Sequence, residues 1–227
     1  MGAAARSRGF GTFLTAADAM VIYEELLDRN LDWALREGSM HFEKDSAVHK
    51  TLRRIADRLE QLGIPYAIAG GMAMFFHGYR RFTEDVDILV TAEGLNRIHE
   101  ELEGRGYLPP FSRSRNLRDT ELGVRIEFLV AGQYPGDGKP KPVAFPDPAE
   151  AAVEIEGVRI VSLPKLIELK LASGITNPRR ARDLADVQEL IDRLKLPDDL
   201  ADVLDPTVRE KYRELWQIVR DYPSQPE

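Results

Sequence analysis

The stretch that decides the fold lies at residues 66–90 and reads YAIAGGMAMFFHGYRRFTEDVDILV. It opens with the short apolar run 66–69, which stands between a proline and two glycines and is typical of a buried strand. A short helix is expected directly after the glycines. Residues 85–90 alternate polar and apolar side chains at their start, the pattern of a second strand. The stretch therefore predicts a strand, a tight turn, a short helix and another strand.

Gly70 and Gly71 occupy the predicted turn between the first strand and the helix. Glycine lets backbone N–H groups approach a ligand without a Cβ atom in the way, and a helix N-terminus adds partial positive charge. The turn is therefore suited to phosphate. A Gly-Gly pair alone is more often only a turn, so this feature needs support from its surroundings.

Three carboxylates supply that support. Asp85 and Asp87 stand at positions i and i+2 of a strand, so both side chains project from one face. Glu127 is an acid inside the apolar strand Arg125–Leu129. Unpaired carboxylates in buried strands are costly, and a hard divalent cation such as Mg²⁺ offsets that cost through oxygen ligation. If the two strands are neighbours, the three acids form a metal site; the alternative is that each acid faces solvent.

The rest of the chain gives an outline of its organisation. Helical spacing predicts one helix over residues 15–35, with Thr15 as N-cap and Gly38 at its end, and a second helix from Ser46 to Leu62. Further strands are expected at 124–130, paired with a segment at 116–121, and in a hairpin over 153–161. Only helical patterns follow, at about 163–173, 178–194 and 207–221.

This order of elements predicts an α+β fold, with a mixed β-sheet flanked by helices and a C-terminal helical subdomain. The expected division is an N-terminal arm and helix over residues 1–45, a core over 46–162 and a helical subdomain over 163–227.

Composition narrows the class of protein. The chain has 227 residues, 43% hydrophobic and 30% charged, and contains no cysteine, which excludes disulfides, thiolate metal sites and cysteine nucleophiles. No apolar run approaches the ~20 residues of a membrane span, and the start lacks the apolar core of a secretory signal. We expect a cytoplasmic protein without a membrane association. The net charge of −7 argues against general nucleic-acid binding.

The run from Ala69 to Ile88 resembles the signature of the polymerase-β-type nucleotidyltransferase superfamily: an apolar strand, Gly-Gly, then Asp-apolar-Asp after ten to fifteen residues. Its details are similar to the AbiEii-like group of small bacterial nucleotidyltransferases, which includes type IV toxin–antitoxin toxins. A second similarity is the Lys170 segment followed by Arg180-Ala181-Arg182-Asp183-Leu184-Ala185-Asp186. The resemblance covers about residues 48–194.

The resemblance implies a nucleotidyltransferase fold and metal-dependent transfer of a nucleoside monophosphate from an NTP to an acceptor hydroxyl. Asp85 and Asp87 would hold two Mg²⁺ ions, and Glu127, where the family often has Asp, would ligate the ion that activates the acceptor. Gly70 and Gly71 would cradle the β- and γ-phosphates. The acceptor would be tRNA or a protein, as for a toxin with a cognate antitoxin, or a small molecule such as an aminoglycoside.

Two cations are further candidates for nucleotide binding. Arg81 either contacts phosphate or pairs with Glu84 in the loop. Lys170, on an apolar helix face, either reaches the triphosphate or extends to solvent from the edge of the core. Asp183 and Asp186 either brace Lys170 or form an intrahelical ion-pair network.

Basic clusters elsewhere are either solvated faces or parts of a polyanion site: Arg80-Arg81, Arg113/Arg115/Arg118 and Arg179/Arg180/Arg182. Two other functions stay open beside the transferase. One is an inactive nucleotide-binding or scaffold protein of the same fold, and the other is an unrelated metal-dependent phosphohydrolase.

Overall fold

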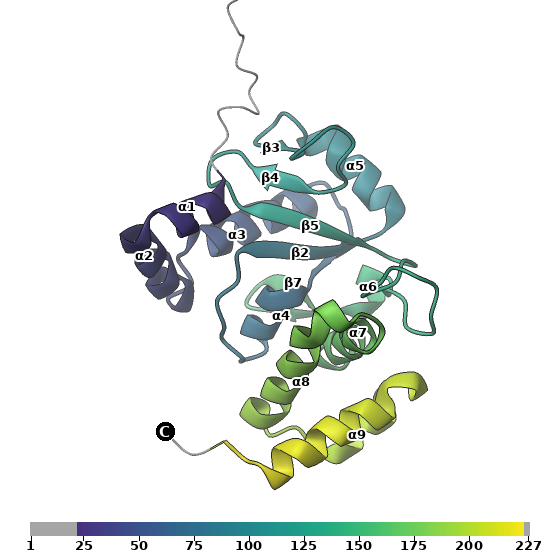
Figure 1. Cartoon of the computed structure of the whole chain (residues 1–227). Helices are drawn as coiled ribbons and strands as arrows, with labels where there is room; N and C mark the ends of the chain where they lie inside the picture. Colours follow the sequence, from purple (N-terminus) through teal and green to yellow (C-terminus); the bar gives the residue numbers. More distant parts are fainter. Residues whose placement is uncertain (1–21, 225–227) are drawn as a thin grey trace, which may run out of the picture.

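A computed structural model describes residues 22–224 and contains one seven-stranded mixed sheet with helices packed around it (Figure 1). The strand order is β3-β4-β5-β2-β1-β7-β6. The strands are β1 Tyr66–Ile68, β2 Asp85–Val90, β3 Tyr107–Leu108, β4 Leu117–Asp119, β5 Arg125–Val130, β6 Ala152–Ile155 and β7 Val158–Val161. The expected α+β class, with a mixed sheet flanked by helices, is confirmed.

The helices lie before, between and after the strands. They are α1 Tyr23–Arg29, α2 Leu31–Phe42, α3 Ala47–Gln61, α4 Gly70–Phe76, α5 Ala92–Leu102, α6 Pro148–Ala151, α7 Leu163–Thr176, α8 Ala181–Leu194 and α9 Pro206–Asp221, with 3₁₀ turns η1 Pro178–Arg180 and η2 Asp198–Val203. Between residues 22 and 224, no helix is both long and apolar enough to cross a membrane.

The centre of the sheet sets the geometry of everything above it. Strand β2 runs parallel to β5 with Asp87 opposite Glu127, and antiparallel to β1 on its other side. The apolar side chains of β2 at Val86, Ile88 and Leu89 are fully buried. A one-residue slip would turn every side chain of a strand to the opposite face, so burial of these residues fixes the register.

The expected single helix over residues 15–35 is wrong in its described part. Asn30 has an extended backbone (φ −131°, ψ 93°) and its side chain accepts a hydrogen bond from the Trp33 amide, so it ends α1 and caps α2. Gly38, the expected terminator, lies inside α2, where a helical glycine costs only about 1 kcal/mol. Thr15 and the start of the predicted helix lie outside the described residues.

The C-terminal helices form a separate layer below the sheet in Figure 1, where α7 and α8 lie side by side and α9 crosses beneath them. All three were expected at nearly these bounds. One cluster of buried apolar side chains extends from Tyr23 to Leu215. The division into segments 1–45, 46–162 and 163–227 stays a prediction.

Two buried histidines lie at the junction of α2 and α3. His41 and His49 are at most 1% exposed, and Ser46 Oγ lies 3.1 Å from His49 Nδ1. Nε2 of His41 lies 3.0 Å from the Arg81 carbonyl oxygen, so this pair touches the loop that leads to β2. Burial, reinforced by the neighbouring His41, lowers the pKa of His49 to about 4.

We expect this histidine to make stability depend on pH. With its pKa depressed in the folded state, His49 binds fewer protons than in the unfolded chain, so its stabilising contribution is complete above about pH 6.5 and is lost as the pH falls toward 4. The loss amounts to about 3 kcal/mol at most. Urea unfolding of His49→Asn, whose amide can keep the Ser46 contact, should show a smaller drop between pH 7.5 and 5. His99→Gln, at a partly exposed position of α5, is the control. A drop in His49→Asn equal to that of the wild type and of this control would contradict the prediction.

Candidate active site

A cavity of about 1020 Å³ lies between the sheet and the C-terminal helices. Its floor is formed by the turn after β1 and by side chains of β2 and β5, and its far wall by α7, η1 and α8. It is lined by all the candidate site residues from the sequence: Gly70, Gly71, Arg81, Asp85, Asp87, Glu127 and Lys170. The structure thus brings every site residue expected from the sequence to one cavity.

The three acids meet because β2 and β5 are parallel neighbours in register. Asp85 and Asp87 lie on one face of β2, and Glu127 stands opposite Asp87 on the same face of β5. One ligand oxygen from each lies within 4.8 Å of the others. This spacing brings three negative charges within mutual Coulombic reach.

Gly70 is required by a close approach to Asp87. Its φ is +56°, a conformation that L side chains rarely adopt, and a Cβ atom there would lie 1.8 Å from Asp87 Oδ2. At Gly71 a Cβ atom would lie 2.7 Å from Thr83 Oγ1. The glycine pair therefore lets the start of α4 pack directly against the acids.

Asp87, like Asp85 and Glu127, is half-buried. Burial, and after it the negative charges of Asp85 and Glu127, raise the pKa of Asp87 to about 7. Lys170 and Arg180 act in the opposite direction. The fold thus holds a carboxyl group where a cation is needed to keep it ionised.

Arg125 and Thr83 contact the acids and were not singled out from the sequence. Thr83 Oγ1 donates to Asp85 Oδ1 at 3.0 Å, and Arg125 Nη2 donates to Asp85 Oδ2 at 2.9 Å. Arg125 Nε also lies 3.2 Å from Glu127 Oε1. The available signal was the two-residue period of a strand, which puts Arg125 on the same face as Glu127.

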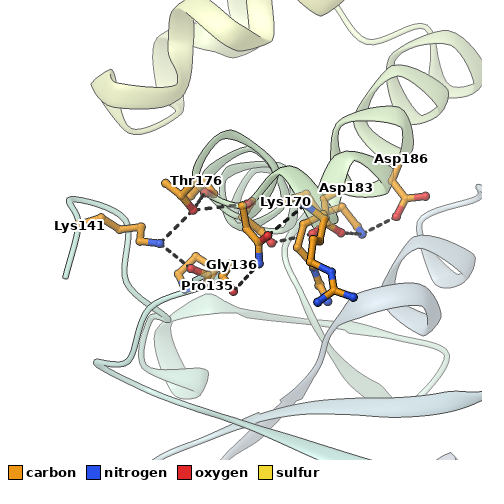
Figure 2. A network of polar contacts seen from close by, with 12 residues as sticks. Pro135, Gly136, Lys141, Lys170, Thr176, Asp183 and Asp186 are labelled. Atoms are coloured by element: carbon orange, nitrogen blue, oxygen red, sulfur yellow. Dashed lines mark hydrogen bonds and ion pairs between the residues drawn. The ribbon is translucent and has the colours of Figure 1, made fainter. Parts of the chain in front are cut away.

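Lys170 is buried, and its ammonium group is bound by two acids of α8. Nζ donates to Asp186 Oδ2 at 2.6 Å and to Asp183 Oδ1 at 3.1 Å, as Figure 2 shows. Bracing of Lys170 is observed for both acids, and Asp183 also accepts from Arg180 Nε, three residues earlier in the chain, at 2.9 Å. Contact between Lys170 and a triphosphate stays a prediction.

Arg81 joins the same network from the other side of the cavity. Its Nη2 donates to Asp186 Oδ2 at 3.2 Å, and its side chain is 18% exposed. Its partner is thus Asp186 and not Glu84. The loop between α4 and β2 is thereby tied to α8, across the cavity from the glycine turn.

A loop of residues 131–147 closes one end of the cavity and is tied to α7. Lys141 Nζ donates to the Pro135 carbonyl at 2.7 Å and to Thr176 Oγ1 at 3.0 Å (Figure 2). Gly136 packs against α7, where a Cβ atom would lie 2.8 Å from the Ser173 carbonyl oxygen. The cavity thus has a wall formed by this loop.

The acids fit a divalent metal ion. Three carboxylates are hard oxygen donors, and the fit is supported by Asp87, whose side chain has no hydrogen-bond partner among the described residues and whose ionisation is opposed by its surroundings. Asp85, Asp87 and Glu127 would hold the ion. No histidine contributes to the cluster.

One comparison with known proteins bears on this chemistry. The sequence model of the aminoglycoside-2''-adenylyltransferase family matches residues 51–163, about half of the chain. No curated protein matches the sequence. The matched segment includes the glycine turn and all three acids, and the chain is a nucleotidyltransferase, an enzyme class whose donor substrate is a nucleoside triphosphate.

Solved structures with a related arrangement have low sequence identity. The antibiotic-resistance factor ANT(2'')-Ia in solution is 16% identical, with 75% of this chain and 95% of that chain covered and a TM-score of 0.49. The same factor in complex with adenylyl-2''-tobramycin is 15% identical over 77% and 98%, with a TM-score of 0.46. JHP933 from Helicobacter pylori is 17% identical over 77% and 90%, with a TM-score of 0.43.

The close approach at Gly70 gives a direct test of the site. In Gly70→Ala the new methyl group collides with Asp87, so we expect Mn²⁺ affinity, measured by the electron paramagnetic resonance of free Mn²⁺, to fall at least about tenfold. Gly138→Ala is the matched control: its φ is +72°, it lines the same cavity, and its Cβ would meet nothing within 4 Å. Equal losses in both variants would attribute the effect to backbone strain and contradict the role of the collision.

Proposed function

We propose that the chain transfers a nucleoside monophosphate from an NTP to an acceptor hydroxyl, with Mg²⁺ held by Asp85, Asp87 and Glu127. The observation that carries the proposal is the alignment of these three acids on one face of β2 and β5, beside the Gly70-Gly71 turn. Two bound Mg²⁺ ions would neutralise the triphosphate and stabilise both the attacking and the leaving oxygen.

The chain's own residues have distinct roles in this reaction. Gly70 and Gly71 line the cavity next to the acids, where their backbone N–H groups would bind phosphates, and Arg81 and Lys170, which line the same cavity, would supply positive charge. The acceptor oxygen attacks the α-phosphorus, the bond from that phosphorus to the bridging oxygen breaks, and pyrophosphate leaves with the electron pair. We assign the hydroxyl proton to the carboxylate of Glu127, whose side chain is more exposed than that of Asp85.

Charges on the cavity wall bear on the acceptor. The carboxylates of the cavity wall outside the three-acid cluster are all paired: Asp137 with Lys141, Asp183 with Lys170 and Arg180, and Asp186 with Lys170 and Arg81. By contrast, three exposed arginines of the wall form no ion pair with any described residue: Arg115, Arg179 and Arg182.

We therefore favour an anionic acceptor. Among the described residues that line the cavity, every carboxylate outside the proposed metal site is already paired with a cation of this chain, so a polycationic aminoglycoside, the acceptor named by the matched family, would have to compete for it. A tRNA offers both hydroxyls and phosphates that exposed arginines bind. The toxin-like role with a cognate antitoxin stays a prediction from the AbiEii-like resemblance.

The reaction is tested with each α-³²P NTP in turn, Mg²⁺, and three acceptors: total tRNA, an aminoglycoside mixture and the protein itself. We expect label on one acceptor and at least about 100-fold less in Asp87→Asn, which keeps the side chain's shape but removes its charge. If the protein binds NTP but labels none of the acceptors, it is an inactive nucleotide-binding protein. Release of inorganic phosphate instead of pyrophosphate would identify a phosphohydrolase, and either result overturns the proposal.

The acceptor class is tested by charge reversal on the wall. We expect label on tRNA, a steep loss of transfer at higher salt, and a rise of about tenfold in the KM for tRNA in Arg182→Glu. Arg36→Glu, an exposed arginine of α2 outside the cavity, makes the same change in net charge and should leave KM within about twofold. Label on the aminoglycosides and not on tRNA would contradict an anionic acceptor.

A further inference from the structure

The guanidinium group of Arg125 lies among the carboxylates of the cluster. Its Nη2 is 2.9 Å from Asp85 Oδ2, and its Nε is 3.2 Å from Glu127 Oε1. Nε is shielded from solvent although the side chain as a whole is 39% exposed. A cation therefore already stands between two of the three acids that a metal would use.

Arg125 would compete with a metal ion both for the carboxylate oxygens of Asp85 and for the negative charge of the cluster. Asp85 accepts from Thr83 through Oδ1 and from Arg125 through Oδ2, so both of its oxygens are engaged. A divalent ion and a guanidinium group also repel each other at contact distance. Binding of the metal by Asp85 and Glu127 therefore requires Arg125 to move.

A second acidic position lies within reach of the displaced side chain. Glu24 of α1 has Oε1 at 3.8 Å from Arg125 Nε, and it is held in place by Arg118, whose Nη1 donates to Glu24 Oε2 at 2.7 Å. Glu84 is close as well. Burial is the largest cause that raises the pKa of Glu84, the charges of Glu24 and Asp85 add to it, and the charge of Arg125 lowers it. By a small rotation of its side chain, Arg125 would leave Asp85 and Glu127 and pair with Glu24 and Glu84 instead.

We propose that Arg125 is an internal counter-ion that occupies the Asp85–Glu127 pair in the metal-free enzyme and yields it to a divalent cation by moving toward Glu24. The inference rests on the proposed function, because it takes the cluster as the metal site. Metal affinity is then set by a competition inside the protein, and Glu24 connects α1 to that competition.

Mn²⁺ binding without nucleotide tests the competition, by electron paramagnetic resonance of the full chain. Arg125→Gln removes the competing charge, so we expect Mn²⁺ to bind about tenfold more tightly than to the wild type. Arg115→Gln is the matched control, an arginine of the same cavity that contacts Gln133 and not the acids, and should change affinity less than about twofold.

Glu24 supplies the second half of the test. Glu24→Gln removes the acid that receives the displaced guanidinium, so Mn²⁺ should bind about threefold more weakly. In the double variant Arg125→Gln/Glu24→Gln, the effect of Glu24 should vanish, because there is no guanidinium left to receive. Arg125→Lys, which cannot bridge two acids with one planar group, should lie between wild type and Arg125→Gln. Circular dichroism and thermal unfolding establish that each variant is folded.

The outcomes separate this inference from the proposed function. Unchanged or weaker Mn²⁺ binding in folded Arg125→Gln overturns the counter-ion role of Arg125. An equal gain in Mn²⁺ affinity in Arg115→Gln overturns it as well. In either case, label transfer by the wild type leaves the proposed function standing. Additive effects of the Arg125 and Glu24 changes overturn the exchange between them. Absence of both Mn²⁺ binding and label transfer in the wild type overturns the proposed function itself.

Discussion

The arrangement of the site depends on one constraint: three carboxylates converge on one face of two neighbouring parallel strands. Two unit charges 4 Å apart interact by about 4 kcal/mol at the effective dielectric of a protein surface, and Asp85, Asp87 and Glu127 hold oxygens within 4.8 Å of one another. The fold offsets this repulsion with Arg125 between two of the acids and with a raised pKa at the third. The charge that remains fits a divalent cation, which the proposed nucleotidyl transfer would use.

The convergence in turn requires a particular chain path. Strands β2 and β5 are parallel, so the chain must cross over between them, and it does so through α5 and the short strands β3 and β4. Strand β4 then pairs antiparallel with β5 and leaves β2 free to pair with β5 on its other edge. Burial of alternate residues in β5 at Ile126 and Phe128 fixes the register that turns Glu127 toward Asp87.

Local patterns in the sequence were sufficient for every strand of the sheet except β3, at Tyr107–Leu108, but not for the order of the strands. Residues 85–90 and 125–130 carry their own alternation, and the glycine turn marks the start of α4, so the fold class could be predicted. The meeting of the three acids depended on whether these two strands are neighbours, which the structure shows. The break at Asn30 could not, because the apolar spacing continues through it and only the capping geometry ends α1. Arg125 was missed for a related reason: an arginine next to a strand's start is ordinarily a solvent-facing residue, and only the pairing with Asp85 shows where its charge lies.

The buried ions of α7 and α8 position parts of the fold relative to one another. Lys170, Asp183 and Asp186 form a buried ion network, and the cost of desolvating buried ions offsets much of their mutual attraction. Its value lies in geometry: Arg81 pairs with the same Asp186 oxygen as Lys170, so the loop that leads to β2 and the helices α7 and α8 share one fixed point. Apolar side chains would fill the space but would not specify the distance between the two walls. The network therefore ties the loop that leads to β2 to the helices α7 and α8, all of which line the cavity.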